Sequence, residues 1–215
     1  LVLENSIVTL DAMGCQRTIA SKILMRGADY LVTLKANQGG MHTAVRDHCA
    51  KTCFGRDVTS RPVCDAFDDS HGRLVRRRVF VCPDAAVLEP LRDWPGLKTV
   101  LAVESIRSVN GSGKVEAEIR YFLSSCDDAP EVLAQAIRQH WRIENSLHWV
   151  LDVTFREDDC RVRERTAVRN FALLRKIALN LVRRHQGSRA SVRGHRKMAA
   201  WDNGYMQQVL SGIFA

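Results

Sequence analysis

The first 53 residues contain two short apolar runs, each followed by a turn and then by apolar residues at helical spacing. Residues 7–10 form a β-branched run that ends at Asp11, and residues 15–27 are predicted to form a helix. The run 30–35 closes in the turn sequence Ala-Asn-Gln-Gly-Gly, and residues 41–53 again predict an amphipathic helix. Strands that alternate with helices predict a parallel, helix-covered sheet and therefore an α/β fold.

The pattern changes after about residue 55, where four runs of strand character are separated by prolines and by an Asn-Gly-Ser-Gly turn at 110–113. These runs predict an antiparallel, β-rich insertion. They cover residues 63–67, 74–82, 98–106 and 115–124.

Two long helices are predicted beyond the insertion. The first runs from about 130 to 150 and opens with acidic capping candidates and Pro130, and the second covers 162–185. The segment from 187 to 195 is basic, contains Gly and Ser, and is predicted to be mobile. The expected parts are core residues 1–55, a β-rich insertion at 56–126, a helical completion of the core at 127–186 and a basic tail at 187–215.

The formal net charge of +8 is unevenly distributed. Residues 1–137 hold 17 Lys and Arg against 17 Asp and Glu, whereas residues 138–215 hold 15 against 7. A basic C-terminal third suits a polyanion such as nucleic acid, and the alternative is a solvated surface of an Arg-rich protein.

Cysteine usage and hydropathy indicate a cytoplasmic protein. The seven cysteines are scattered and odd in number, which favours reduced thiols over a disulfide framework, and Cys49 and Cys53 form no paired C-x-x-C set for zinc. No apolar run approaches the roughly 18 to 20 residues that span a bilayer, so we expect no membrane association. The chain has no initiating Met, and only five residues precede Ser6, where strand character begins. From this we expect a fragment with part of the fold missing upstream.

Asp11 is the first residue with candidate chemistry, because it follows the carboxyl end of a strand, where open α/β sheets place ligands. An Asp at this position alternatively caps the following turn. Further along, His140, Glu144, His148 and Asp152 are each four residues apart, so an α-helix would stack them on one face at intervals of about 6 Å.

Three interpretations of this stack remain open. In the first, a carboxylate binds magnesium for phosphoryl transfer, and the histidines orient that carboxylate or contact DNA. A zinc helix is the second, although the H-E-x-x-H spacing is absent. The third is a structural role in which the histidines are hydrogen-bonded within an interface.

Five phrases of the sequence resemble the H-repeat-associated (ISAs-type) family of bacterial insertion-sequence transposases, and the similarity runs to at least His185. The last and longest phrase is the most specific, whereas H-G-R alone carries no weight. The phrases are V-T-L-D-A-M-G-C-Q at 8–16, T-L-K-A-N-Q at 33–38, H-G-R at 71–73, R-Y-F-L-S-S at 120–125 and H-W-R-I-E-N-S-L-H-W-V-L-D-V-T-F-R-E-D at 140–158.

The resemblance implies a ribonuclease H-like catalytic core, incomplete at its N-terminus and interrupted by a β-rich insertion. It implies that Asp11 is the second Asp and Glu144 the Glu of an Asp-Asp-Glu triad, with His140, His148 and Asp152 as possible supporting residues. DNA cleavage and strand transfer would use two divalent ions, Mg²⁺ or Mn²⁺, held by three converging carboxylates. The first Asp would come from an earlier strand, since Glu4 lies too close to Asp11 along the same segment.

For contact with DNA we favour Arg142, Arg161, Arg165 and Arg169, the last three at spacings of four residues. The alternative is that Arg161 and Arg165 pair with nearby carboxylates. Near the expected site, a strand end is followed by Lys35, Asn37 and Gln38. We expect these residues either to contact DNA or to form a plain turn.

The expected function is that of a DNA transposase fragment, inactive alone, whose partners are double-stranded DNA at the element ends and the target, with a homo-oligomer in the intact parent. One alternative is a DNA-binding remnant or regulator without catalysis. The other is a metal-dependent nuclease that uses Asp11, Glu144 and Asp152 by itself.

Overall fold

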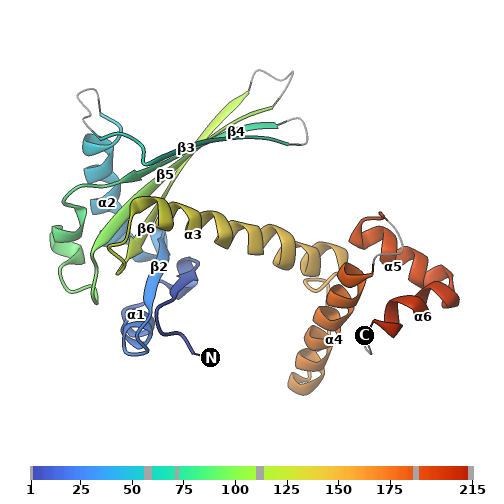
Figure 1. Cartoon of the computed structure of the whole chain (residues 1–215). Helices are drawn as coiled ribbons and strands as arrows, with labels where there is room; N and C mark the ends of the chain where they lie inside the picture. Colours follow the sequence, from blue (N-terminus) through green and yellow to red (C-terminus); the bar gives the residue numbers. More distant parts are fainter. Residues whose placement is uncertain (1, 56–59, 71–72, 110–113, 186–188, 213–215) are drawn as a thin grey trace. The chain divides into compact units, whose positions relative to one another are not determined.

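A computed structural model describes residues 2–55, 60–70, 73–109, 114–185 and 189–212, and the predicted turn at 110–113 and His71 and Gly72 of H-G-R lie outside this range. The chain divides into two compact units, Leu1–His140 and Trp141–Ala215, which are described separately (Figure 1). The described strands are β1 (Ile7–Leu10), β2 (Asp29–Leu34), β3 (Cys64–Ser70), β4 (Arg73–Val81), β5 (Thr99–Val109) and β6 (Val115–Ser124). The described helices are α1 (Arg17–Leu24), α2 (Gly39–Thr52), α3 (Pro130–Ile143), α4 (Arg165–Arg184), α5 (Val192–Trp201) and α6 (Asn203–Ser211).

The six strands form one mixed sheet in the order β1-β2-β6-β5-β4-β3. The pair β1–β2 is parallel, with α1 as its crossover, and every other pair is antiparallel. The parallel start and the antiparallel later strands were both predicted from the sequence. The later strands nevertheless do not form a sheet of their own, because β6 pairs with β2 and so continues the first sheet.

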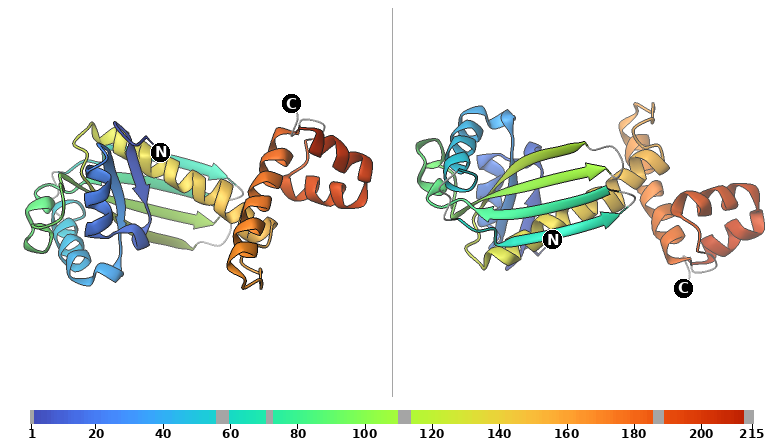
Figure 2. Two further views of the ribbon diagram at one scale, coloured as in Figure 1. Left: turned by 90° about the horizontal axis from the view of Figure 1, so that it is seen from below. Right: turned by 90° about the horizontal axis from the view of Figure 1, so that it is seen from above.

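Both faces of the sheet are covered near β2. Tyr30, Val32 and Leu34 alternate onto the face that α1 and α2 cover, where they join one buried core with Val45 of α2. Leu31 is also buried but points to the other face, along which α3 runs (Figure 2). A strand that is buried on both faces reads as a continuous apolar run, which explains the sequence Y-L-V-T-L at 30–34.

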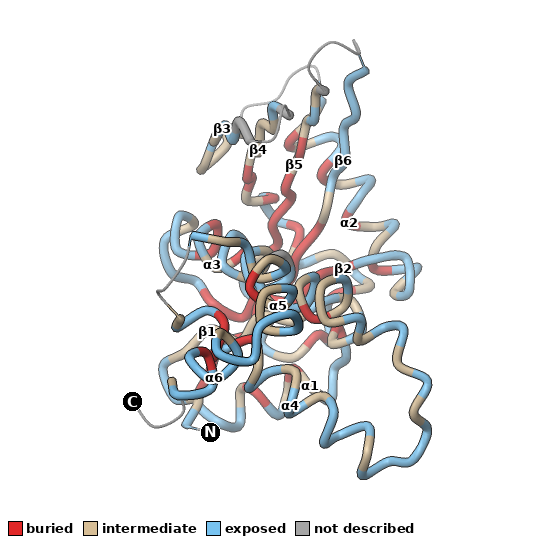
Figure 3. Tube along the Cα trace, turned by 90° about the vertical axis from the view of Figure 1, so that its right-hand side faces the viewer, coloured by how far each residue is buried: buried red, intermediate tan, exposed pale blue. Residues whose placement is uncertain are grey.

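The antiparallel strands β3 to β6 become polar at their ends farther from the helices. The first five residues of β6 are exposed and its last four are buried, a transition that Figure 3 shows along the neighbouring strands. Cross-strand ion pairs stabilise the polar region: Arg76 donates to Asp65 at 2.6 Å, and Arg78 and Glu104 form a second pair.

The second unit consists of helical segments. After α3 the helix continues as two π-helical stretches, Glu144–His148 and Val150–Thr154, before α4. Residues 187–195 were predicted to be mobile, at the start of a basic tail at 187–215; the described residues 189–212 of this segment contain α5 and α6. In α6, Val209 is buried in a small core with Leu181 and Val182 of α4, and His195 of α5 is also buried. Such long-range packing is not visible in a basic, Gly- and Ser-containing stretch.

Candidate functional site

Asp11 lies immediately after the carboxyl end of β1 and is exposed. Its Oδ1 accepts hydrogen bonds from the backbone N–H groups of Met13 at 3.1 Å and Gly14 at 3.4 Å, so the side chain caps the short 3₁₀ turn Ala12–Gly14. A Cβ at Gly14 would lie 2.8 Å from the Cβ of Leu10, so the turn can fold back on the strand only with glycine there. The capping role considered from the sequence is therefore confirmed, and it leaves Oδ2 of Asp11 for another ligand.

The ends of β1 and β2 are held together by the loop after β2. The side-chain amide of Asn37 donates to the carbonyl of Ala12 at 2.8 Å, and that of Gln38 donates to the carbonyl of Cys15 at 2.7 Å. These two residues thus support the Asp11 turn, which favours the turn interpretation of this loop. Lys35 is exposed at the end of β2, beside this pair of strand ends.

His140 fixes α3 beside β1. Its Nδ1 lies 3.1 Å from Oγ1 of Thr9, a hydrogen bond between residues 131 positions apart. Thr9 points to the face opposite Val8 and Leu10, which pack into the core under α1 and α2. Because the backbone of Asp11 is still extended, its side chain follows Thr9 on the α3 face of the strand. His140 therefore joins α3 to the strand that ends at Asp11.

The four-residue stack from His140 to Asp152 does not form on one regular α-helix. The α-helix ends at Ile143, and Glu144 begins the first π-helical stretch, where hydrogen bonds follow an i to i+5 pattern. Glu144 and His148 are exposed and Asp152 is half-buried. The spacing argument was wrong here because it assumed an uninterrupted α-helix, and π-helical turns are frequent at functional sites.

The predicted DNA-binding arginines are all exposed, but only two of them share a helix face. Arg165 and Arg169 lie one turn apart in α4, whereas Arg161 precedes the helix, which corrects the expected row of three. Arg142 is exposed near the end of α3.

The nearby carboxylates mostly have other partners. Glu164 caps α4 through the N–H groups of Thr166 and Ala167, which lowers the pKa of its carboxyl group, and Asp159 pairs with Arg156 at 2.8 Å. The described contacts therefore give little support to the alternative in which these carboxylates neutralise Arg161 and Arg165.

Sequence reasoning missed a cluster of three buried cysteines. Cys49 of α2 and Cys82, which follows β4, form a disulfide with Cα atoms 5.8 Å apart, which contradicts the expectation that all thiols are reduced. Sγ of Cys53 lies 3.8 Å from Sγ of Cys82. The packing of α2 against the sheet brings together residues 33 positions apart, a proximity that spacing alone cannot reveal.

Cys160 differs from the buried cysteines in its electrostatics. A hydrogen bond from Arg175 lowers the pKa of the Cys160 thiol, whereas burial raises the pKa of Cys15 to about 11 and also raises that of Cys126. Because thiolate is the reactive form, Cys160 retains it at lower pH than the buried thiols do.

We therefore expect iodoacetamide near neutral pH to alkylate Cys160 at least about tenfold faster than Cys15, with rates read by peptide mass spectrometry. Arg175→Gln should slow the reaction of Cys160. Half-buried Cys64 is the control for accessibility, and equal rates for Cys160 and Cys64 would contradict the role of Arg175.

The described helices include none that is both long and apolar enough to cross a membrane.

Taken together, the fold and the site define an α/β protein with an acidic residue at the end of a parallel strand and a basic helical unit. The chain belongs to the family described as "Transposase DDE domain", whose model matches residues 2–181. This confirms the resemblance to insertion-sequence transposases.

Curated relatives from Escherichia coli cover nearly the whole chain. "H repeat-associated putative transposase YhhI" and "Putative protein YbfL", both from strain K12, are each 38% identical over 219 residues, which is 99% of this chain and 56% of theirs. "Putative transposase YncI" from O157:H7 is 38% identical over 218 residues, 98% of this chain and 54% of its own. The chain thus spans about half the length of the curated relatives it matches. No solved structure shows significant similarity.

Proposed function

We propose that this chain is the C-terminal part of an Asp-Asp-Glu DNA transposase, which cuts and joins DNA with divalent metal ions. Asp11 and Glu144 are two of the three catalytic carboxylates. The observation that carries the proposal is the hydrogen bond between Thr9 and His140. It holds α3 beside the strand that ends at Asp11, and Glu144 follows His140 by four residues along the chain.

The sheet supports a ribonuclease H-like core. A parallel pair of strands joined by a helix carries Asp11 at its carboxyl end, where α/β sheets concentrate their ligands. On this proposal, residues 1–55 and 127–186 belong to the core and 56–126 are an insertion that extends its sheet. The chain spans about half the length of its relatives, and on this proposal the third carboxylate comes from an earlier strand of the parent protein.

The available donors suit Mg²⁺ or Mn²⁺. Asp11 and Glu144 offer carboxylate oxygens, the ligands that such hard cations prefer, and both residues are exposed. Two ions bound by the three carboxylates would activate the attacking hydroxyl group and stabilise the leaving oxygen. The protein's own contribution is orientation: Met13 and Gly14 fix one oxygen of Asp11, and His140 fixes the helix that leads to Glu144.

The basic second unit supports DNA as the substrate. Exposed Arg165 and Arg169 lie on one face of α4, in the part of the chain that holds the whole excess of positive charge. Cations that neutralise phosphates release counterions, so binding should weaken steeply as salt rises. The second candidate function is a DNA-binding regulator without catalysis. The excess of Lys and Arg in residues 138–215 favours it equally, because DNA binding needs only the cations.

We expect the purified chain to bind duplex DNA in fluorescence anisotropy, with affinity that falls linearly with salt on a double-logarithmic plot. Arg165→Gln and Arg169→Gln should each reduce the slope by about one unit. Arg46→Gln is the matched control, because that exposed arginine lies in the first unit and pairs with Asp47.

Plasmid nicking with Mg²⁺ or Mn²⁺ then separates the candidates. Salt-dependent binding without nicking is the expected result for the chain alone. Nicking that is lost in Glu144→Gln would show a complete metal site and overturn the need for a third carboxylate from outside. Absence of DNA binding at low salt would contradict both candidates.

A further inference from the structure

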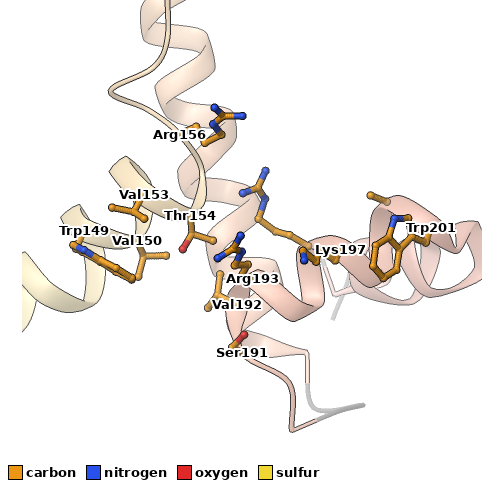
Figure 4. Close-up of a pocket in the computed structure, with 12 residues that line it drawn as sticks. Trp149, Val150, Val153, Thr154, Arg156, Ser191, Val192, Arg193, Lys197 and Trp201 are labelled. Atoms are coloured by element: carbon orange, nitrogen blue, oxygen red, sulfur yellow. The ribbon is translucent and has the colours of Figure 1, made fainter. Parts of the chain in front are cut away.

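A pocket of about 800 Å³ lies within the second unit. The second π-helical stretch and the residue before it supply Trp149 and Val153, while α5 and its capping residue supply Ser191, Val192 and Trp201 (Figure 4). Its volume falls within the range of roughly 300 to 1,000 Å³ that is typical of pockets for small organic groups.

Two tryptophans line this pocket from different elements. Trp149 is 56% exposed and Trp201 is 79% exposed, and Figure 4 shows them on opposite sides of the pocket. Indole rings usually bury most of their large apolar surface, so two exposed rings around one pocket indicate a ligand with flat apolar faces.

The space between the tryptophans is strongly cationic. Arg156, Arg193, Arg196 and Lys197 line it, and none of the described lining residues is Asp or Glu. Arg196 lies over the ring of Phe155, with its Cζ 4.6 Å from the ring centroid, so this guanidinium is held in place by a cation–π contact. The ligand is therefore expected to carry negative charge as well as flat rings.

We propose that the Trp149–Trp201 pocket binds unpaired nucleotides of a DNA strand. Stacking on an aromatic ring requires a base that has left the duplex, whereas paired DNA presents mainly phosphates and needs only cations. The pocket offers indole faces for bases and, besides Arg156, which pairs with Asp159, three further cations for phosphates. This inference rests on the proposed function, since it assumes that the chain acts on DNA.

The pocket adds a binding site beyond the family match. Residues 191–201, which contribute seven of its twelve lining residues, lie after the matched range 2–181. It also uses none of the arginines predicted from the sequence to contact DNA. Paired DNA bound by α4 and an unpaired segment bound in the pocket would thus be separable contributions to affinity.

The test compares two fluorescein-labelled DNAs: a blunt duplex, and the same duplex with a single-stranded extension of about six nucleotides. We expect the extension to tighten binding to the chain by about tenfold or more, the effect of one stacked base. Trp149→Ala combined with Trp201→Ala should remove that gain while leaving blunt-duplex binding unchanged. Both side chains are exposed, so the variant should keep the circular dichroism spectrum of the parent.

Two controls separate stacking from other effects. Phe171→Ala removes an exposed aromatic ring of α4 outside the pocket and should preserve the gain. Lys197→Gln should weaken binding of the extended DNA more than Lys176→Gln, which removes the same charge outside the pocket. A polyglutamate peptide of matched charge should compete at least about tenfold less well than a single-stranded oligonucleotide.

Equal affinity for blunt and extended DNA, unaffected by the double tryptophan variant, would overturn the pocket while leaving DNA binding by the chain intact. Equal competition by polyglutamate would show that the pocket recognises charge alone, and would also overturn the proposal. Failure to bind either DNA would refute the pocket together with the proposed function.

Discussion

Asp11→Asn and Glu144→Gln are each expected to reduce metal-dependent DNA cleavage by about 1,000-fold in a protein that contains this chain and the third carboxylate. Removing one carboxylate from a shared metal site forfeits several kcal/mol of transition-state stabilisation, and about 4 kcal/mol corresponds to that factor. Asparagine at position 11 keeps an oxygen that can accept the hydrogen bonds from Met13 and Gly14, so the turn should survive the substitution. Initial rates of plasmid nicking with Mg²⁺ and with Mn²⁺ measure the effect.

The matched control is Glu131→Gln, which removes an exposed carboxylate from the first turn of α3 and should leave the rate within about twofold. Unfolding curves of the variants should coincide with that of the parent, because Asp11 and Glu144 are both exposed. Full activity of Glu144→Gln with either metal would show that Glu144 is not a catalytic carboxylate. The proposed pair of Asp11 and Glu144 would then be contradicted.

Leu101→Ala is expected to lower the free energy of unfolding by about 3 to 5 kcal/mol. Leu101 is 0% exposed in β5, between Val81 of β4 and Phe122 of β6, so truncation leaves a cavity that the surrounding strands cannot easily fill. Urea unfolding followed by far-ultraviolet circular dichroism measures the change.

Val115→Ala is the control for the cavity, because Val115 is mostly exposed at the start of β6 and its truncation should cost less than about 1 kcal/mol. A cost for Leu101→Ala no larger than that of the control would contradict the central position of β5 in the sheet.

Local sequence patterns predicted most individual elements. The β-branched and apolar runs marked each of the six strands in the described part of the chain within a few residues, since a half or fully buried strand requires such side chains. The carboxyl end of the first strand marked Asp11, because that position depends only on the order of elements in the chain. The uneven distribution of charge along the chain located the basic unit, because charge is a property of composition.

The site's details depended on contacts across the chain. The pairing of Thr9 with His140 joins residues 131 positions apart, and no local pattern encodes it. The change from α- to π-helix after Ile143 altered the stacking that a four-residue spacing predicts, because spacing fixes a face only when the helical repeat is constant.

The sequence by itself determined the strands, the position of Asp11 just after β1, and the basic character of the last third. Only the tertiary structure decided that the antiparallel strands continue the first sheet, that Cys49 meets Cys82, and that residues 192–211 fold into helices with a tryptophan- and arginine-lined pocket. The physical reason is that periodicity and composition are local, whereas sheet order, sulfur proximity and pocket shape arise when distant segments bury their apolar surfaces against one another.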